Sequence, residues 1–384
     1  MDNFEVQDKQ NNDGKKKRRG CLIAIIIAVL IIATPIVYFL GTLAYHNIMI
    51  DRYGGHGFDY MNGWSSTDFT GYHVYDGEKL ATLDHPVEKM IEGVENMPVL
   101  DGAEACYPLY ASIAKALYKD IETIELDAKR EYEEIAAKGD VWRNDHWDDV
   151  RWDWVNGRIV SFYNTKRAYR RLVDKEVDLV FGATPSKNQI EYASSEGETI
   201  EPIPIGREGF VFFVEEDNPV DGLTSEEIRK IYSGEITNWR EVGGKNQKIV
   251  PYQRPEDSGS QVMMEYFMGE VPLMEAGKYE IISAMGDVIE EVKQYHNERG
   301  AMGYTFHYFL TGLQQEKGVK ILAVDGVYPT VETIKDGSYP LVVNVVCSKL
   351  ESNDDPYVQE VIDFILSEDG QELLEKTGYA PLKQ

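Results

Sequence analysis

Cysteine and basic residues are scarce in this sequence, and each shortage excludes a class of protein. Three cysteines among 384 residues are too few for a disulfide scaffold or a cysteine-rich zinc module. Lysine and arginine number 39 against 66 aspartates and glutamates, which gives a formal net charge of −27. A nucleic-acid-binding protein needs a basic face, so this balance argues against nucleic acid as a partner. The acidity does not identify a ligand, because a local site can carry the opposite sign to the whole chain.

Histidine is also sparse, and the common patterns of hydrolases and metalloenzymes are missing. The sequence contains no His-x-x-x-His pair and no Gly-x-Ser-x-Gly. Ser258 stands between Asp257 and Gly259 with no histidine nearby in sequence, so a triad would have to assemble through the fold. We therefore expect no enzymatic activity, no cofactor and no metal site. The histidines are scattered at positions 46, 56, 73, 85, 146, 296 and 307.

One long apolar run stands near the N-terminus. The basic block Lys15–Arg19 precedes the run Cys21–Leu43. At ~1.5 Å rise per residue, such a helix reaches the ~30 Å thickness of a hydrocarbon core. The sequence predicts one transmembrane helix over residues 21–45, with the basic tail of residues 1–20 in the cytoplasm and the rest outside the cell. A cleaved signal peptide is the alternative, but its apolar region usually has only ~7–15 residues.

The part of the chain after this run changes character once. Residues 46–96 are rich in Gly, Tyr and Asp, and they predict a tether followed by an N-terminal embellishment. From Met97 onward strand and helix signals alternate, which is typical of α/β layers. Helices are predicted at 109–118, 168–173, 224–234, 260–268 and 357–366, and strands at 177–181, 209–214, 248–252, 301–306, 320–324 and 341–347. The tryptophan-rich stretch 141–155 predicts an inserted segment whose tryptophans pack it onto the domain. The alternative is that these rings stack on a base or a sugar.

The sharpest local pattern is Arg254-Pro-Glu-Asp-Ser258-Gly259-Ser260, which stands between a predicted strand and a predicted helix. Glycine lets the backbone approach a ligand closely, and the free N–H groups of a helix start can bind an anion. The serine hydroxyls add donors, and Arg254 adds a planar, permanently charged fork suited to an oxyanion. The pattern predicts an anion-binding loop, and an ordinary capped helix beside a surface arginine is the alternative.

Several segments between residues 97 and 384 resemble the phosphate-binding proteins of ABC transporters, in the periplasmic-binding-protein superfamily. The matching segments are Pro98–Leu109, Thr165–Tyr169, Val177-Asp178, Asn218–Thr224, Tyr232–Trp239, Ala301–Tyr304, Gly378–Leu382, and Arg254 with Ser258, Gly259 and Ser260. The first two resemble the first and second binding loops of the family with their helices. The last matches the anion-cradling loop of the family in every spacing.

The resemblance implies an α/β fold, the type II clamshell, in which two lobes close on a ligand by hinge bending. Lobe one would comprise residues 97–208 plus 339–384, and lobe two would comprise residues 209–338. No covalent chemistry is implied. The residues that the resemblance places at the ligand are Arg254, Ser258, Gly259, Ser260, Thr165, Cys106, Tyr107 and Glu104.

The sequence departs from the family in lobe one. Phosphate binders present small hydroxyl residues in the first loop, where residues 103–106 of this chain read Ala-Glu-Ala-Cys. Members also use an Asp just after the second strand to accept the proton of hydrogen phosphate, and residues 182–186 contain no acid. Glu104 could replace that acceptor, repel the anion, or point outward beside a helix N-terminus. Cys106 and Cys347 would both lie in lobe one, as a disulfide or as small buried side chains.

Together these features predict a membrane-anchored, extracellular solute-binding protein that captures phosphate or a related oxyanion for an ABC importer. Its partners would be the anion, an ABC permease, and the cell membrane through one helix. The alternative is a receptor, with a sensory or adhesive ectodomain of the same fold, a different ligand and no transport role. The predicted cytoplasmic tail is too short for a signalling domain, so such a receptor would need a partner.

Overall fold

The architecture is taken from a computed structural model of the chain. It describes residues 33–35, 37–38, 40–41, 67–137, 157–276, 281–282, 285–294, 300–314 and 318–382. Residues 1–52 and 53–384 form two separate compact units. Among the described residues, no helix is both long enough and apolar enough to cross a bilayer. The predicted span at 21–45 lies mostly outside these residues, and the tryptophan-rich stretch at 141–155 lies wholly outside them.

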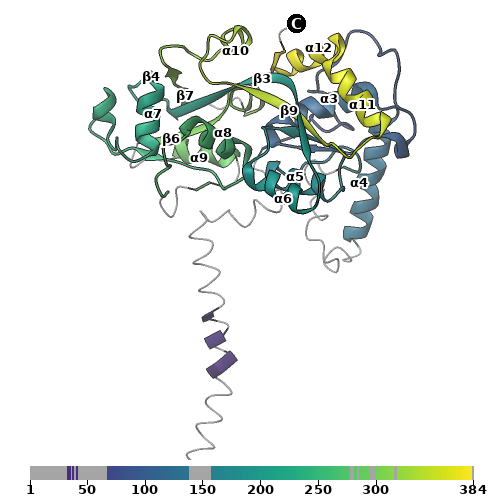
Figure 1. Cartoon of the computed structure of the whole chain (residues 1–384), viewed down its shortest axis with the longest axis horizontal. Helices are drawn as coiled ribbons and strands as arrows, with labels where there is room; N and C mark the ends of the chain where they lie inside the picture. Colours follow the sequence, from purple (N-terminus) through teal and green to yellow (C-terminus); the bar gives the residue numbers. More distant parts are fainter. Residues whose placement is uncertain are drawn as a thin grey trace, which may run out of the picture. The chain divides into compact units, whose positions relative to one another are not determined.

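The long strand β3 (Ile200–Glu215) belongs to both halves of a mixed sheet in residues 53–384. Its first part pairs antiparallel with β9 (Val342–Leu350), and its second part pairs antiparallel with β6 (Ala301–Phe306). The strand order is β1-β2-β9-β3-β6-β5, and β10 and β7 also pair with β3. We call the side with β1 and β2 the first half and the side with β5 and β6 the second half. Figure 1 shows β3 and β9 running between the two halves.

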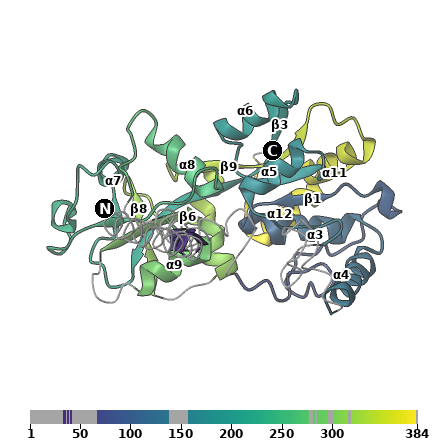
Figure 2. The same ribbon diagram turned by 90° about the horizontal axis from the view of Figure 1, so that it is seen from below.

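The first half is built on β1 (Leu100–Gly102) and β2 (Leu179–Gly182), which are parallel and fully buried. A capping box between Ser186 and Gln189 starts one of its helices, because each side chain satisfies the other residue's backbone N–H. In Figure 2, α3, α4, α5 and α11 group on this side. The helices of the first half are α3 (Tyr107–Leu117), α4 (Ile121–Ala137), α5 (Thr165–Val173), α6 (Lys187–Ser195), α11 (Pro356–Leu366) and α12 (Glu368–Thr377).

The segment before β1 is part of the first-half core. Phe69, Val74, Leu80 and Ile91 are buried in the same hydrophobic cluster as α3 and β2. The ring of Phe69 lies 5.1 Å from that of Tyr107, centroid to centroid. The short elements here are η1 (Val94–Asn96) and η2 (Glu104–Cys106), while β10 (Ala380–Pro381) returns to pair with β3.

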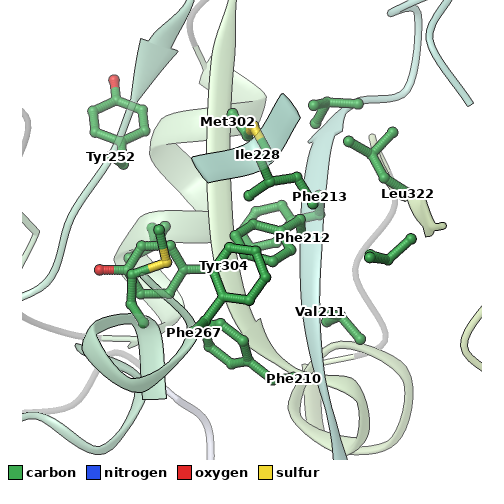
Figure 3. Packing of buried hydrophobic residues seen from close by; sticks show 14 of the residues in the cluster. Phe210, Val211, Phe212, Phe213, Ile228, Tyr252, Phe267, Met302, Tyr304 and Leu322 are labelled. Carbon is green, nitrogen blue, oxygen red and sulfur yellow. The ribbon is translucent and has the colours of Figure 1, made fainter. Parts of the chain in front are cut away.

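The second half has an aromatic core, which Figure 3 shows at close range. Phe210 and Phe212 of β3 pack against Tyr304 of β6, and Phe212 also contacts Phe267 with ring centroids 5.4 Å apart. Burying these rings removes much apolar surface from water, at roughly 25 cal/mol per Å². The elements of this half are β4 (Gly222–Leu223), α7 (Ser225–Tyr232), η4 (Trp239–Val242), β5 (Val250–Pro251), α8 (Gly259–Met268), α9 (Met285–Gln294), the π-helix η5 (Phe309–Gln314), β7 (Val319–Ile321), β8 (Ala323–Val324) and α10 (Val331–Asp336).

The predicted elements appear near their expected places, with one large difference. The strand predicted at 209–214 begins at Ile200, because Pro202 and Pro204 pair with β9 despite their missing N–H groups. Among the described residues, the first part of β3 has β9 on one side and the short β10 on the other, so prolines are tolerated there. Cys106 and Cys347 are both free and buried, so the small-side-chain alternative is confirmed over the disulfide.

Candidate functional site

The start of α8 forms a donor-rich surface. The Ser258 hydroxyl accepts a hydrogen bond from the Gln261 N–H at 3.4 Å and so caps the helix. The other N–H groups of the first turn have no acceptor within the helix. Ser260 is fully buried, and its hydroxyl has no hydrogen-bond partner among the residues that the structure describes. Such a group of donors suits an anion.

Arg254 is buried beside this helix start. Its backbone N–H donates to Gln261 Oε1 at 3.0 Å and to the Tyr304 hydroxyl at 3.1 Å, which fixes the loop to α8 and β6. Burial raises the pKa of Tyr304, and the positive charge of Arg254 opposes that shift. The tyrosine therefore stays protonated and donates to Gln261. Since Arg254 is only 6% exposed, its permanent charge acts in a medium that screens it weakly.

The start of α5, in the first half, lies directly against the start of α8. A Cβ added to Gly259 would lie 3.2 Å from Thr165 Oγ1 and 3.5 Å from Ala183 Cβ. A side chain here would therefore crowd Thr165, so glycine favours the close approach, and Thr165 is the first residue of α5. Asn164 caps α5 by accepting the Arg167 N–H at 3.1 Å. The fold thus brings two helix N-termini together, and both carry partial positive charge.

Asp101, at the end of β1, positions the segment that leads into α5. Its buried carboxylate accepts the N–H groups of Gly102 at 2.7 Å and Tyr163 at 3.0 Å, and it pairs with Arg171. Arg171 also lies over the Tyr163 ring, 4.2 Å from its centroid. Burial raises the pKa of Asp101, and the Arg171 guanidinium opposes the shift. These contacts fix the position of Thr165 relative to the end of β1.

Glu104 is buried in η2, which immediately precedes α3. The Thr67 hydroxyl donates to its carboxylate, so a residue of the predicted tether contacts the predicted binding loop. The sequence did not suggest this contact, because Thr67 and Glu104 are far apart along the chain and neither belongs to a recognisable pair.

Cys106 and Tyr107 are placed differently from one another. The Cys106 thiol accepts a hydrogen bond from the Tyr379 hydroxyl at 3.7 Å, and burial raises the pKa of Cys106 to about 12, so it is neutral. Tyr107 points its ring into the core, 5.1 Å from Phe69 and 5.4 Å from Tyr110 between centroids. Its backbone N–H donates to the Glu104 carbonyl. The ring of Tyr107 is thus engaged in packing, and its role at the ligand stays a prediction.

A small cavity of about 20 Å³ lies between the first loop, the end of β2 and the strands β3 and β9. Ala103, Cys106, Ala183 and Glu208 are among its lining residues. The Glu208 carboxyl group accepts the Gly209 N–H at 2.7 Å and the Tyr308 N–H at 3.2 Å. Burial raises the pKa of Glu208 to about 8. Sequence analysis missed this residue, although an acidic residue inside a buried strand was an available signal.

A larger groove, of about 790 Å³, lies elsewhere and does not fit an anion. It lies between α10 and α12, and none of the predicted site residues is in its lining. Its charged lining residues are Arg207, Glu332, Lys335, Asp336, Glu368, Glu372 and Glu375. The excess of carboxylates would repel an oxyanion. The helix starts of α5 and α8, with Arg254, are therefore the better anion site.

Comparison with known protein families identifies the family of the chain. The sequence model of a family described as the PBP superfamily domain matches residues 160–369, which is more than half of the chain. The chain belongs to the PBP superfamily. The matched part contains β3, which joins the halves, and both helix starts at the site. It also contains Thr165, Arg254 and the three residues Ser258–Ser260.

Two curated relatives are named as phosphate-binding proteins. The phosphate-binding protein PstS of Borreliella burgdorferi is 29% identical over 184 residues, which cover 46% of this chain and 64% of that protein. The phosphate-binding protein PstS of Bacillus subtilis is 28% identical over 176 residues, covering 45% of this chain and 55% of that protein. The chain thus spans less than two thirds of the length of these relatives.

One solved structure shows the same fold. It is a structure from Clostridium perfringens, described as a phosphate ABC transporter substrate-binding protein with bound phosphate. It is 22% identical, covers 74% of this chain and 99% of its own, and superposes with a TM-score of 0.51. At this identity the similarity establishes the α/β binding-protein fold.

Proposed function

We propose that the chain is an extracellular solute-binding protein that captures phosphate or a related oxyanion between its two halves for an ABC importer. One observation carries the proposal: the N-termini of α5 and α8 meet at Thr165 and Gly259, beside the buried Arg254. Two helix N-termini that meet favour negative charge, and the buried guanidinium of Arg254, whose backbone is bonded to α8, would add to this. The similarity to phosphate-binding relatives narrows the anion to phosphate or a close analogue.

Membrane anchoring is part of the proposal. The apolar run Cys21–Leu43 after the basic block Lys15–Arg19 favours a single helix with its N-terminus in the cytoplasm. An anchor of this kind would keep a binding protein at the cell surface, near an importer.

Isothermal titration calorimetry of the purified full chain tests the ligand. Phosphate, sulfate and an organic phosphate monoester would be titrated separately at neutral pH. We expect phosphate to bind at micromolar or lower concentration and sulfate to bind more weakly. Failure of all three anions to bind at millimolar concentration would contradict the proposal and favour a receptor of the same fold with another ligand.

A further inference from the structure

Asp257 lies in the second half, directly before the capping residue of α8, but its contacts are with the first half. Its carboxylate accepts hydrogen bonds from Ser186 Oγ at 2.7 Å and from Asn188 Nδ2 at 3.1 Å. The Lys166 ammonium lies 3.3 Å from the other carboxylate oxygen. The backbone carbonyl of Asp257 accepts from Gln189 Nε2 at 3.4 Å. The donors come from α5, from the cap of α6 and from α6 itself, so one residue connects two helices of the opposite half.

The backbone of Asp257 is shaped for this contact. Its φ is 66°, in the left-handed region, which glycine adopts freely and asparagine and aspartate adopt at a modest cost. The turn lets the carboxylate reach α6 while Ser258 begins the next helix. A residue held in this region at a small cost usually has surroundings that favour it, and here those surroundings are donors from the other half.

Burial makes these contacts strong. Asp257 is only 7% exposed, so its charge is withdrawn from water and depends on its donors for compensation. Hydrogen bonds to a charged acceptor are stronger than neutral ones. If the halves moved apart, the carboxylate would lose those donors, and the loss would be offset only by renewed hydration.

The neighbouring acid provides a contrast. Glu256 also accepts a hydrogen bond from Asn188 Nδ2, at 2.9 Å, but this contact is exposed to solvent. An exposed contact of this kind contributes little, because water and salt screen it. Glu256 and Asp257 therefore carry the same charge in the same loop but differ in burial and in the number of donors that they bind.

We propose that Asp257 is a clasp that holds the two halves together and so sets how long a bound anion stays. The clasp is one residue from the donors at Ser258, Gly259 and Ser260, so anion binding and clasp formation order the same loop. Asp257 does not touch the anion in this account; it is a positioning residue. The effect on ligand release rests on the proposed function, whereas the effect on the distance between the halves does not.

The distance between the halves can be measured by double electron–electron resonance on the full chain. Spin labels at Ile190→Cys in α6 and Tyr266→Cys in α8 report it, since these side chains are 47% and 60% exposed. Cys21 would be replaced by serine, while Cys106 and Cys347 are buried and unreactive. The test variants are Asp257→Asn, Lys166→Met and the double variant; asparagine is chosen because it tolerates a positive φ. Glu256→Gln is the control, because it removes the same charge from the same loop. Thermal unfolding checks that each variant is folded.

We expect Asp257→Asn to add a longer-distance population without ligand and to raise the rate of phosphate release about tenfold, with a small change in association rate. Lys166→Met should also add the longer-distance population and raise the release rate. The double variant should change both by less than the sum of the two single variants. Glu256→Gln should behave as wild type. Identical distance distributions for wild type and Asp257→Asn would overturn the clasp. If wild type binds no phosphate, the proposed ligand fails, but the distances without ligand still decide the clasp.

Discussion

Arg254 has the largest expected effect on ligand affinity of any single residue at the site. We predict that Arg254→Ala weakens phosphate binding by roughly 2–5 kcal/mol, because truncating one partner of a desolvated charge pair removes its full interaction. Calorimetric titration of the variant measures this loss. Arg240→Ala, an exposed arginine in η4, removes the same charge away from the site and serves as the control. Equal affinity in wild type and Arg254→Ala would show that the anion does not bind there.

Glu104 is expected to affect selectivity more than affinity. A carboxylate that accepts the proton of hydrogen phosphate leaves sulfate, which has no proton at neutral pH, facing an unpaired acceptor. We predict that Glu104→Gln reduces the preference for phosphate over sulfate about tenfold or more. Binding of both anions would be measured by calorimetry. If both bind more tightly to the variant, Glu104 repels the ligand instead. If neither affinity changes, Glu104 lies outside the site.

Contacts between single residues are where sequence analysis was weakest. The spacing of Arg254 from Ser258 and Ser260 predicted the donors on α8, because a capped helix start after a strand is a local pattern. The contacts of Asp257 with Ser186 and of Thr67 with Glu104 join segments far apart in the sequence. No local pattern identifies such partners. The packing of the Tyr107 ring against Phe69 was likewise not visible, because a tyrosine beside a binding loop and a tyrosine in the core look the same in sequence.

At the scale of elements, α5 and α8 depend on the glycine at their meeting point. We predict that Gly259→Ala weakens phosphate binding about tenfold, because a Cβ would crowd Thr165 and overpacking typically costs ~1–3 kcal/mol. The melting temperature should fall only slightly, since alanine favours a helix more than glycine does and so offsets part of that cost. Tyr266→Ala, at an exposed position of the same helix, is the control. Wild-type affinity in Gly259→Ala would mean that the two helix starts need not approach so closely.

The strand β3 carries a buried titratable group where it passes between the halves. The pKa of Glu208 is about 8 in the folded protein and about 4.5 when the side chain is exposed, so the folded state holds a proton that the unfolded state releases. The free energy of unfolding should therefore fall as the pH rises from about 5 to about 8, by up to ~1.4 kcal/mol per pH unit from this residue. Glu208→Gln should remove that contribution.

Urea denaturation at several pH values checks this prediction. The quantity of interest is the difference between wild type and Glu208→Gln, since other buried carboxyl groups such as Asp101 titrate in both proteins. A difference that does not change between pH 5 and pH 8 would contradict the assignment of a raised pKa to Glu208.

Helices and strands were predicted well where neighbouring residues determine them, and poorly where contacts with distant segments determine them. Thr224 and Glu227 form a capping box at the start of the helix predicted at 224–234, and the helix predicted at 260–268 is observed at Gly259–Met268. The first part of β3 was missed because Pro202 and Pro204 argue against a strand. Pairing with β9 outweighs that preference, and this pairing is not visible from a single segment.

At the scale of the whole molecule, the alternation of strands and helices predicted an α/β fold, and the observed mixed sheet with its helices confirms it. The lobe boundaries stay a prediction, although the passage of β3 and β9 between the halves is consistent with hinge bending there.

The topology of the chain can be tested in cells. We predict that protease added to intact, wall-stripped cells digests the part after residue 46 and leaves the N-terminal tail, because the basic block favours a cytoplasmic N-terminus. An epitope on the tail and another near residue 382 would be followed by immunoblotting. Protection of the C-terminal epitope until the cells are lysed would contradict the predicted orientation.

The central claim is that two helix starts and Arg254 together bind one oxyanion. A crystal structure of the full chain grown with phosphate tests it most directly. We expect a phosphate ion between the N-termini of α5 and α8, in contact with the Arg254 guanidinium and the Ser260 hydroxyl. A phosphate bound elsewhere, or a site with no anion at saturating phosphate, would contradict it.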